Sequence, residues 1–111
     1  MTVLTSGGRA RVEAALVLPE RLDGATVPDL RDAVWFAVDS TPGPDVVVDV
    51  SQVLMVDSVG LGLLLAAHRA CRSQGRRLLL VDPQPRLLRL LAVTRLHRVL
   101  HVERVGVPEG A

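Results

Sequence analysis

The run Val56-Asp57-Ser58-Val59-Gly60-Leu61-Gly62 joins a valine-rich segment, residues 46–50, to an apolar segment, residues 61–72. This pattern predicts a buried strand followed by a helix that begins near Ser58. A hydroxyl at that position can cap the helix by accepting a backbone N–H bond, a place for which Asp57 competes. It can also accept a phosphate, because a helix N-terminus carries a positive partial charge and free N–H donors. The two uses of Ser58 are compatible, and the run alone leaves both open.

The helical period after Ser58 separates a core face from an outer face. At 100° per residue, one face collects small and apolar residues: Gly60, Leu63, Leu64, Ala67, Ala70 and Cys71. Leu61, Gly62 and Leu65 fall on a different side, together with Ser58. A glycine at an exposed helical position costs about 1 kcal/mol relative to alanine, so we interpret Gly62 as leaving the backbone bare for a partner protein. Gly60, on the core face, is expected to let the helix approach the sheet.

Leu61 and Leu65 allow two interpretations. They either extend the edge of the core or form an apolar contact patch beside Ser58, continued by His68 and Arg72.

The three histidines of the chain show no metal-ligand spacing with one another or with the single cysteine. We therefore expect surface or capping histidines and no metal site.

The rest of the chain alternates between strand and helix patterns. The predicted strands cover residues 11–18, 46–50, 78–81 and 99–105, with a weak signal for another before Gly7. The predicted helices cover residues 26–39, 59–74 and a leucine-rich stretch that begins at 82–85. Thr26 and Asp29 form a capping-box-like pair, and Gly75 is expected to end the second helix. A solvated basic face is expected from four arginines at and after the third helix: Arg86, Arg89, Arg95 and Arg98.

This order of elements predicts an α/β fold with a mixed, mostly parallel sheet. A sheet buried on both faces would consist of continuous apolar strands, whereas strand 11–18 has a charged face and Asp49 interrupts the valine strand. We therefore expect the helices to pack mainly on one face. The 111 residues are expected to form a single domain, 1–111, with less ordered ends at residues 1–8 and 106–111.

Composition and charge argue against several function classes. The formal net charge of +1 provides no basic field for direct binding of nucleic acid. The longest run of apolar or glycine residues, 59–67, is far too short to cross a bilayer, so we expect a cytoplasmic protein without membrane insertion. Ser58 lacks the Gly-x-Ser-x-Gly context of a hydrolase nucleophile, and the sequence predicts no enzyme activity, no catalytic residue and no cofactor.

The run 57–62, with the order of elements around it, resembles the STAS domain, most closely the bacterial anti-anti-sigma factors (anti-sigma factor antagonists). The Leu22-Asp23 turn and the strand 46–51 also fit the resemblance, which covers roughly residues 9 to 105. It implies that a partner anti-sigma factor serine kinase phosphorylates Ser58. It further implies that the unphosphorylated form binds this kinase and releases a sigma factor, that the phosphate switches binding off, and that a phosphatase restores it.

The resemblance also implies where the partner binds. Asp57 corresponds to the acidic residue before the phosphorylated serine, and Asp23 to an aspartate on a loop that borders the kinase-binding surface. The expected partner contacts are Asp23, Asp57, Val59, Leu61, Gly62 and Leu65. The chain is expected to be a monomer or a weak dimer. The alternative function is that of a STAS accessory subunit of a membrane lipid-transport system, which is not phosphorylated.

Overall fold

The computed structural model describes residues 3–6 and 9–104 and has an α/β architecture whose main sheet is parallel. The strands of this sheet are, in spatial order, β3 (Leu16–Val17), β5 (Asp45–Asp49), β7 (Arg77–Val81) and β8 (His101–Glu103). Two smaller sheets pair β4 (Arg21–Leu22) in parallel with β6 (Met55–Val56), and β1 (Val3–Ser6) antiparallel with β2 (Arg9–Val12). The helices are α1 (Val27–Ser40), α2 (Ser58–Ser73), α3 (Pro85–Val93) and the 3-10 helix η1 (Leu96–Arg98).

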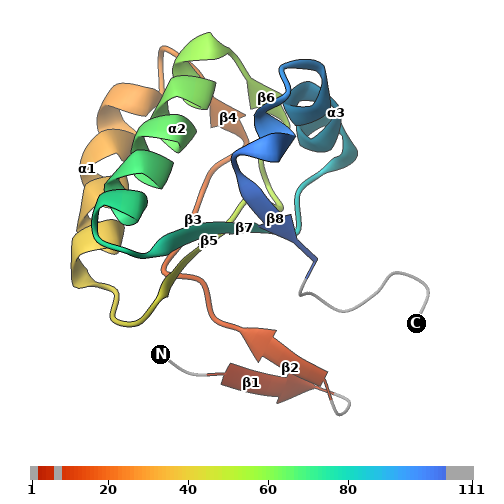
Figure 1. The fold of residues 1–111 in the computed structure, drawn as a ribbon. Coiled ribbons are helices and arrows are strands. Elements are labelled where there is room, and N and C mark those ends of the chain that lie inside the picture. Colours follow the sequence, from red (N-terminus) through yellow and green to blue (C-terminus); the bar gives the residue numbers. More distant parts are fainter. Residues whose placement is uncertain (1–2, 7–8, 105–111) are drawn as a thin grey trace.

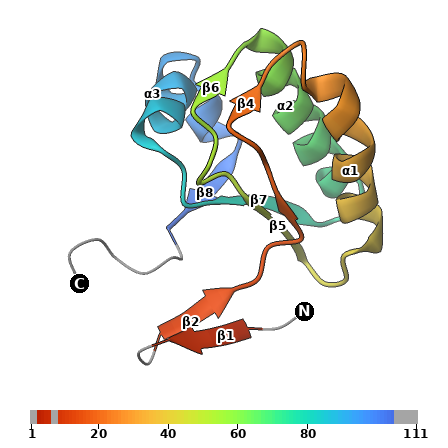
Figure 2. The same cartoon turned by 180° about the vertical axis from the view of Figure 1, so that it is seen from behind.

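The α-helices lie on one face of the main sheet and the β1–β2 hairpin lies on the opposite side (Figure 1), as the view from behind also shows (Figure 2). Successive side chains of a strand point to opposite faces, so Val46 and Val48 of β5 join the larger core with the helices, whereas Val47 joins a smaller cluster. Leu78 and Leu80 of β7 complete the sheet side of the larger core. The predicted fold, a mostly parallel sheet with helices mainly on one face, is confirmed.

The predicted strand 11–18 is in fact two strands. β2 ends at Val12, and a new set of bonds begins where the Ala15 N–H donates to Val47 O over 2.8 Å and the Leu18 N–H donates to Asp49 O over 3.0 Å. The chain changes partners between them, because β2 pairs with β1 whereas β3 pairs with β5. An alternating pattern reports which way side chains face and carries no information about the neighbouring strand, so the prediction of one continuous strand is wrong.

The segment after α3 also differs from its prediction. The expected strand 99–105 shortens to β8, because the N–H groups of Val99 and Leu100 donate to Leu96 O at 2.9 and 2.8 Å and complete η1 instead. Val105 and the expected less ordered end, 106–111, lie outside the described residues, as do residues 1, 2, 7 and 8. In the part of the chain that the structure describes, no helix is long and apolar enough to cross a membrane.

Candidate functional site at the start of helix α2

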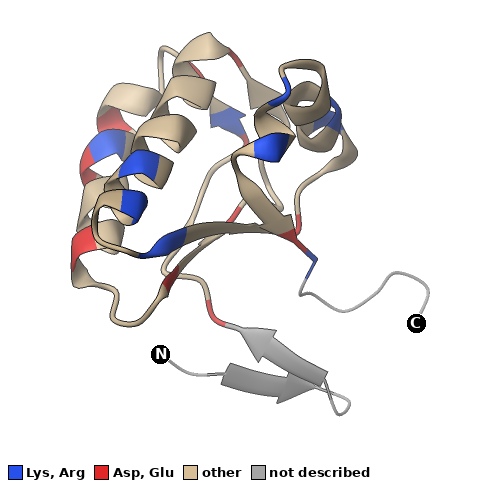
Figure 3. Ribbon diagram, in the orientation of Figure 1, with Lys and Arg blue, Asp and Glu red and all other residues tan. Residues whose placement is uncertain are grey.

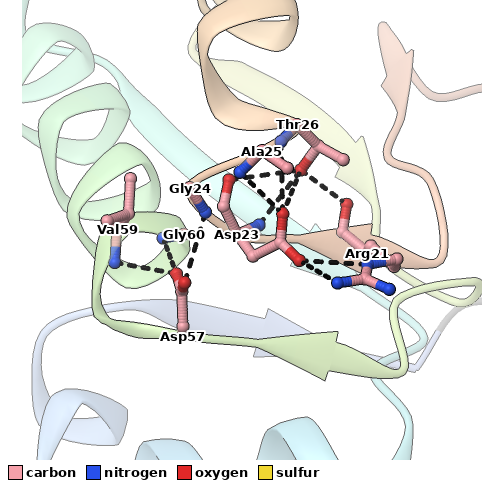
Figure 4. A network of polar contacts seen from close by, with 8 residues as sticks. All are labelled: Arg21, Asp23, Gly24, Ala25, Thr26, Asp57, Val59 and Gly60. Carbon is pink, nitrogen blue, oxygen red and sulfur yellow. Dashed lines mark hydrogen bonds and ion pairs between the residues drawn. The ribbon is translucent and has the colours of Figure 1, made fainter.

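Asp23 and Asp57 are far apart in the sequence, but the loops that carry them lie side by side (Figure 4). Asp23 directly follows β4 and Asp57 directly follows β6, and these strands pair in parallel with Leu22 opposite Val56. The carboxyl ends of paired parallel strands meet at the same edge of a sheet, which brings the two loops together. The Gly24 N–H donates to Asp57 Oδ2 over 3.2 Å and links them directly.

Asp57 is the cap of α2. Its backbone is extended, with φ −110° and ψ −172°, and its Oδ1 accepts from the Val59 N–H at 2.9 Å and from the Gly60 N–H at 3.0 Å (Figure 4). Ser58 is already the first helical residue, so the expectation that it could cap the helix is wrong. Because the carboxylate takes the capping role, the Ser58 side chain is exposed and has no hydrogen-bond partner among the described residues.

Asp23 organises the loop that leads into α1. Its carboxylate accepts from Arg21 Nε and Nη2 at 3.0 and 2.8 Å and from the N–H groups of Ala25 and Thr26 at 3.0 and 3.2 Å. The Arg21 hydrogen bond is the main cause that lowers the pKa of Asp23. The Thr26 hydroxyl donates to Arg21 O and accepts from the Asp23 N–H, so it does not cap α1. The predicted capping box with Asp29 is therefore wrong, because local loop groups take the threonine hydroxyl.

Gly60 sets the distance between α2 and β4. A Cβ at this position would lie 2.0 Å from the backbone oxygen of Leu22 and 2.8 Å from its carbonyl carbon. The expectation that Gly60 lets the helix approach a strand is thus confirmed. A Cβ at Gly62 would meet nothing within 4 Å, and this residue is exposed as expected. The first turn of α2 is therefore pressed against β4, with Ser58 at its exposed end.

The outer face of α2 combines exposed and half-buried residues. Val59 is 45 % exposed and Gly62 is exposed, whereas Leu61 and Leu65 are half-buried and pack against the larger core. The interpretation that the two leucines extend the core edge is therefore confirmed, and each of them stays partly accessible at the surface. The role of these four residues as partner contacts, like that of the two aspartates, stays a prediction.

His68 does not continue this outer face. It is 5 % exposed, so the prediction of a surface histidine is wrong. It lines the same hollow as Leu96 and Val99, within and just after η1, and its ring centroid is 6.3 Å from that of His101 on β8. The sequence did not predict η1 and so could not show that this segment would share a hollow with His68. Among the described residues, Nδ1 of His68 has no hydrogen-bond partner.

We expect the melting temperature to fall as the pH drops below the ordinary histidine pKa of 6.5. Burial lowers the pKa of His68, and the charges of Arg72, His101 and Arg69 act in the same direction. The unfolded chain therefore binds this proton more readily, so stability is full above pH 6.5 and is lost as the pH falls toward the lower folded-state pKa. Thermal denaturation from about pH 7.5 to about pH 5.5 measures the effect.

The matched variants for this pH dependence are His68→Leu and His97→Gln. His68→Leu should show a weaker pH dependence than the wild type, whereas His97→Gln, at an exposed position, should follow the wild type. If His68→Leu kept the full pH dependence, the effect would have another source.

A cleft that sequence reasoning missed opens beside Asp57. It has a volume of about 490 Å³ and lies between β6 and α3, with Leu54 and Met55 on one side and Arg86 and Val93 on the other. Leu54 and Met55, two exposed apolar residues just before the run 56–62, were the one local sign of such a surface. Only the packing of α3 beside β6, two segments distant in the sequence, turns that pair into the wall of a cleft. No three side chains of metal-ligating type gather within the described residues.

Comparisons of sequence place this chain among known relatives. A family model described as Mlab, STAS domain, matches residues 7–102. The anti-sigma-B factor antagonist of Staphylococcus aureus (strain NCTC 8325 / PS 47) is 32 % identical over 82 residues, which are 73 % of this chain and 74 % of that protein. The protein of the same name from Listeria monocytogenes is 27 % identical over 84 residues, covering 76 % and 73 % of the two chains.

Solved structures show the same fold. An anti-sigma-factor antagonist (STAS) domain protein from Planctomyces limnophilus has a TM-score of 0.71 at 18 % identity, covering 95 % of this chain and 90 % of that one. The anti-sigma factor antagonist SpoIIAA in its unphosphorylated form has a TM-score of 0.59 at 19 % identity, with 88 % and 86 % covered. The family match, the relatives and the shared fold agree: the chain belongs to the STAS domain family, in the group of the bacterial anti-sigma factor antagonists.

Proposed function

We propose that this chain is a regulatory binding protein that, when unphosphorylated, binds an anti-sigma factor with serine kinase activity and thereby releases a sigma factor. The observation that carries the proposal is the exposed Ser58 hydroxyl at the first position of α2, left without an internal partner because Asp57 caps the helix. The relatives named anti-sigma-B factor antagonists support this role.

In the proposed reaction, Ser58 accepts the γ-phosphoryl group of ATP. The bond from Ser58 Oγ to phosphorus forms as the bond to the β-phosphate oxygen breaks, ADP leaves, and the hydroxyl proton passes to a base of the kinase. This chain contributes an exposed nucleophile at a fixed place, because Gly60 and the Asp57 cap hold the first turn against β4 and its loop. The partner supplies the ATP site and the catalysis.

The phosphate would act through its charge. It adds about −1.5 to −2 charges at pH 7 next to Asp57. The N–H groups of Val59 and Gly60 already donate to Asp57, so the helix offers the phosphate few free donors. The charge of the phosphate would therefore face the partner. A partner surface that fits the neutral serine and Val59 must then desolvate a dianion beside a carboxylate. Binding is opposed without any change of fold, and a phosphatase that removes the group restores it.

Intact-mass measurement after incubation with ATP and the cognate anti-sigma kinase tests the proposal. The wild type should gain the mass of one phosphate, and Ser58→Ala should gain none while still binding the kinase. Ser73→Ala is the matched control, because the Ser73 hydroxyl is engaged with Ala70 O at 2.8 Å, and it should be phosphorylated like the wild type.

Two results would count against this assignment. Phosphopeptides that map to Ser51 or Ser73 would move the modified residue elsewhere. A wild-type chain that gains no phosphate would instead favour the unphosphorylated accessory subunit of a transport system as the function of this STAS domain.

A further inference from the structure

The cleft between β6 and α3 is an exposed apolar surface rimmed by basic side chains. Met55 on one wall is 50 % exposed, Leu54 beside it is 39 % exposed, and Val93 at the end of α3 is 75 % exposed. Leu90, on the α3 side, also lines the cleft and is half-buried. Apolar side chains that gather around a hollow, rather than being scattered singly, are typical of a surface that another molecule covers.

The charges around this cleft have one sign on the α3 side. Helix α3, which forms this side, contains Arg86 and Arg89 and no aspartate or glutamate (Figure 3). Arg86 and Arg89 line the cleft, are exposed, and form no ion pair with any described residue. Their guanidinium groups are therefore available to an anionic partner.

The carboxylates on the opposite wall form no ion pairs with these arginines. Asp23 is held by Arg21 at 2.8 Å and by two backbone N–H groups, and Asp57 is held by three backbone N–H groups. Both are thus engaged with their own side of the cleft. The unmatched positive charge on α3 and the apolar side chains that line the cleft together select the chemistry of an occupant: apolar side chains flanked by carboxylates.

We propose that the cleft docks an acidic, amphipathic segment of the anti-sigma factor, with apolar side chains between Met55 and Leu90 and carboxylates on Arg86 and Arg89. This rests on the proposed function and deepens it, because Asp57 lines the cleft and directly precedes Ser58. One partner can therefore cover the serine and the cleft at once. The serine serves the switch, whereas the two arginines select which anti-sigma factor binds.

Charge reversal with a matched control tests this docking site. Arg86→Glu/Arg89→Glu is compared with Arg31→Glu/Arg98→Glu, which changes the net charge equally at exposed positions outside the cleft. Calorimetric titration of each full chain with the purified cognate anti-sigma factor gives the affinity. The cleft variant should bind about tenfold or more weakly, the control within about threefold of the wild type, and the affinity of the cleft variant should depend less on salt.

Each other outcome has a defined meaning. Equal affinity for the wild type and the cleft variant overturns the docking site and leaves the Ser58 switch intact. An equal loss in the cleft variant and the control also overturns it, because net charge alone would then explain the effect. A wild type that binds no anti-sigma factor overturns the proposed function and this inference with it. Circular dichroism verifies folding, and Arg86→Gln/Arg89→Gln repeats the test with a milder change.

Discussion

Gly60→Ala should lower the free energy of unfolding by about 3 kcal/mol or more, and the melting temperature by roughly 10 °C or more. The added Cβ would lie 2.0 Å from Leu22 O, and the obstacle is backbone that no side-chain rotation can move. Relief requires α2 to withdraw from β4. That movement would also strain the parallel pairing of β4 with β6 and the bond from the Gly24 N–H to Asp57.

Gly62→Ala is the matched control in the same helix. Its Cβ would meet nothing within 4 Å, so only the helix propensity changes, and alanine is favoured there by about 1 kcal/mol. Thermal and urea denaturation should show Gly62→Ala at or above the wild-type stability and Gly60→Ala far below it. A Gly60→Ala variant as stable as the wild type would show that α2 does not press against β4 in solution.

Phosphorylation of Ser58 should weaken binding of the anti-sigma factor by about 100-fold or more, because like charges brought together at an interface cost several kcal/mol. Ser58→Asp should weaken binding less, since it adds one charge and fewer acceptor oxygens than a phosphate. The Ser58→Asp fold should be unchanged, because an acidic residue in the first turn of a helix is favourable. Titration of the three forms with the same partner measures these affinities.

Amide NMR spectra of the unmodified and phosphorylated forms separate a charge effect from a conformational switch. Shifts confined to the surroundings of Ser58 and the first turn of α2 support the charge effect. Shifts that extend through β7 or α3 would mean that the phosphate rearranges the fold, and the electrostatic account would be wrong.

Much of the fold could be predicted because its signals are local. The apolar residues that begin at Gly60 follow the period of an α-helix, so the sequence also shows which of them are buried. Likewise, Val46 to Val48 alternate between the two faces of β5. The features that sequence reasoning missed depend on contacts between segments that are distant in the sequence. The split between β2 and β3 depends on which strand lies alongside each of them. The surroundings of His68 include residues of η1 and β8, which lie about thirty residues further along the chain.

The candidate site shows the same division. The run 56–62 predicted that Ser58 lies at the start of α2. It did not show whether Asp57 or Ser58 caps the helix, and the backbone geometry of the structure identifies Asp57. The cleft has no motif of its own. Its walls come from β6 and α3, so its shape follows from packing that no single stretch of sequence encodes.

Because Asp57 caps α2, the contacts that stabilise the start of this helix are separate from the residue that we propose is phosphorylated. The side-chain bonds that cap α2 and tie it to Gly24 all end on this one carboxylate, and none involves the Ser58 side chain. Under the proposed function, a duplicated copy that lost the serine would keep its fold and no longer respond to the kinase. A copy that lost the aspartate would lose the cap of α2 and with it part of its stability. Evolution can therefore change the residue at position 58 while the capping contacts of Asp57 keep the fold stable.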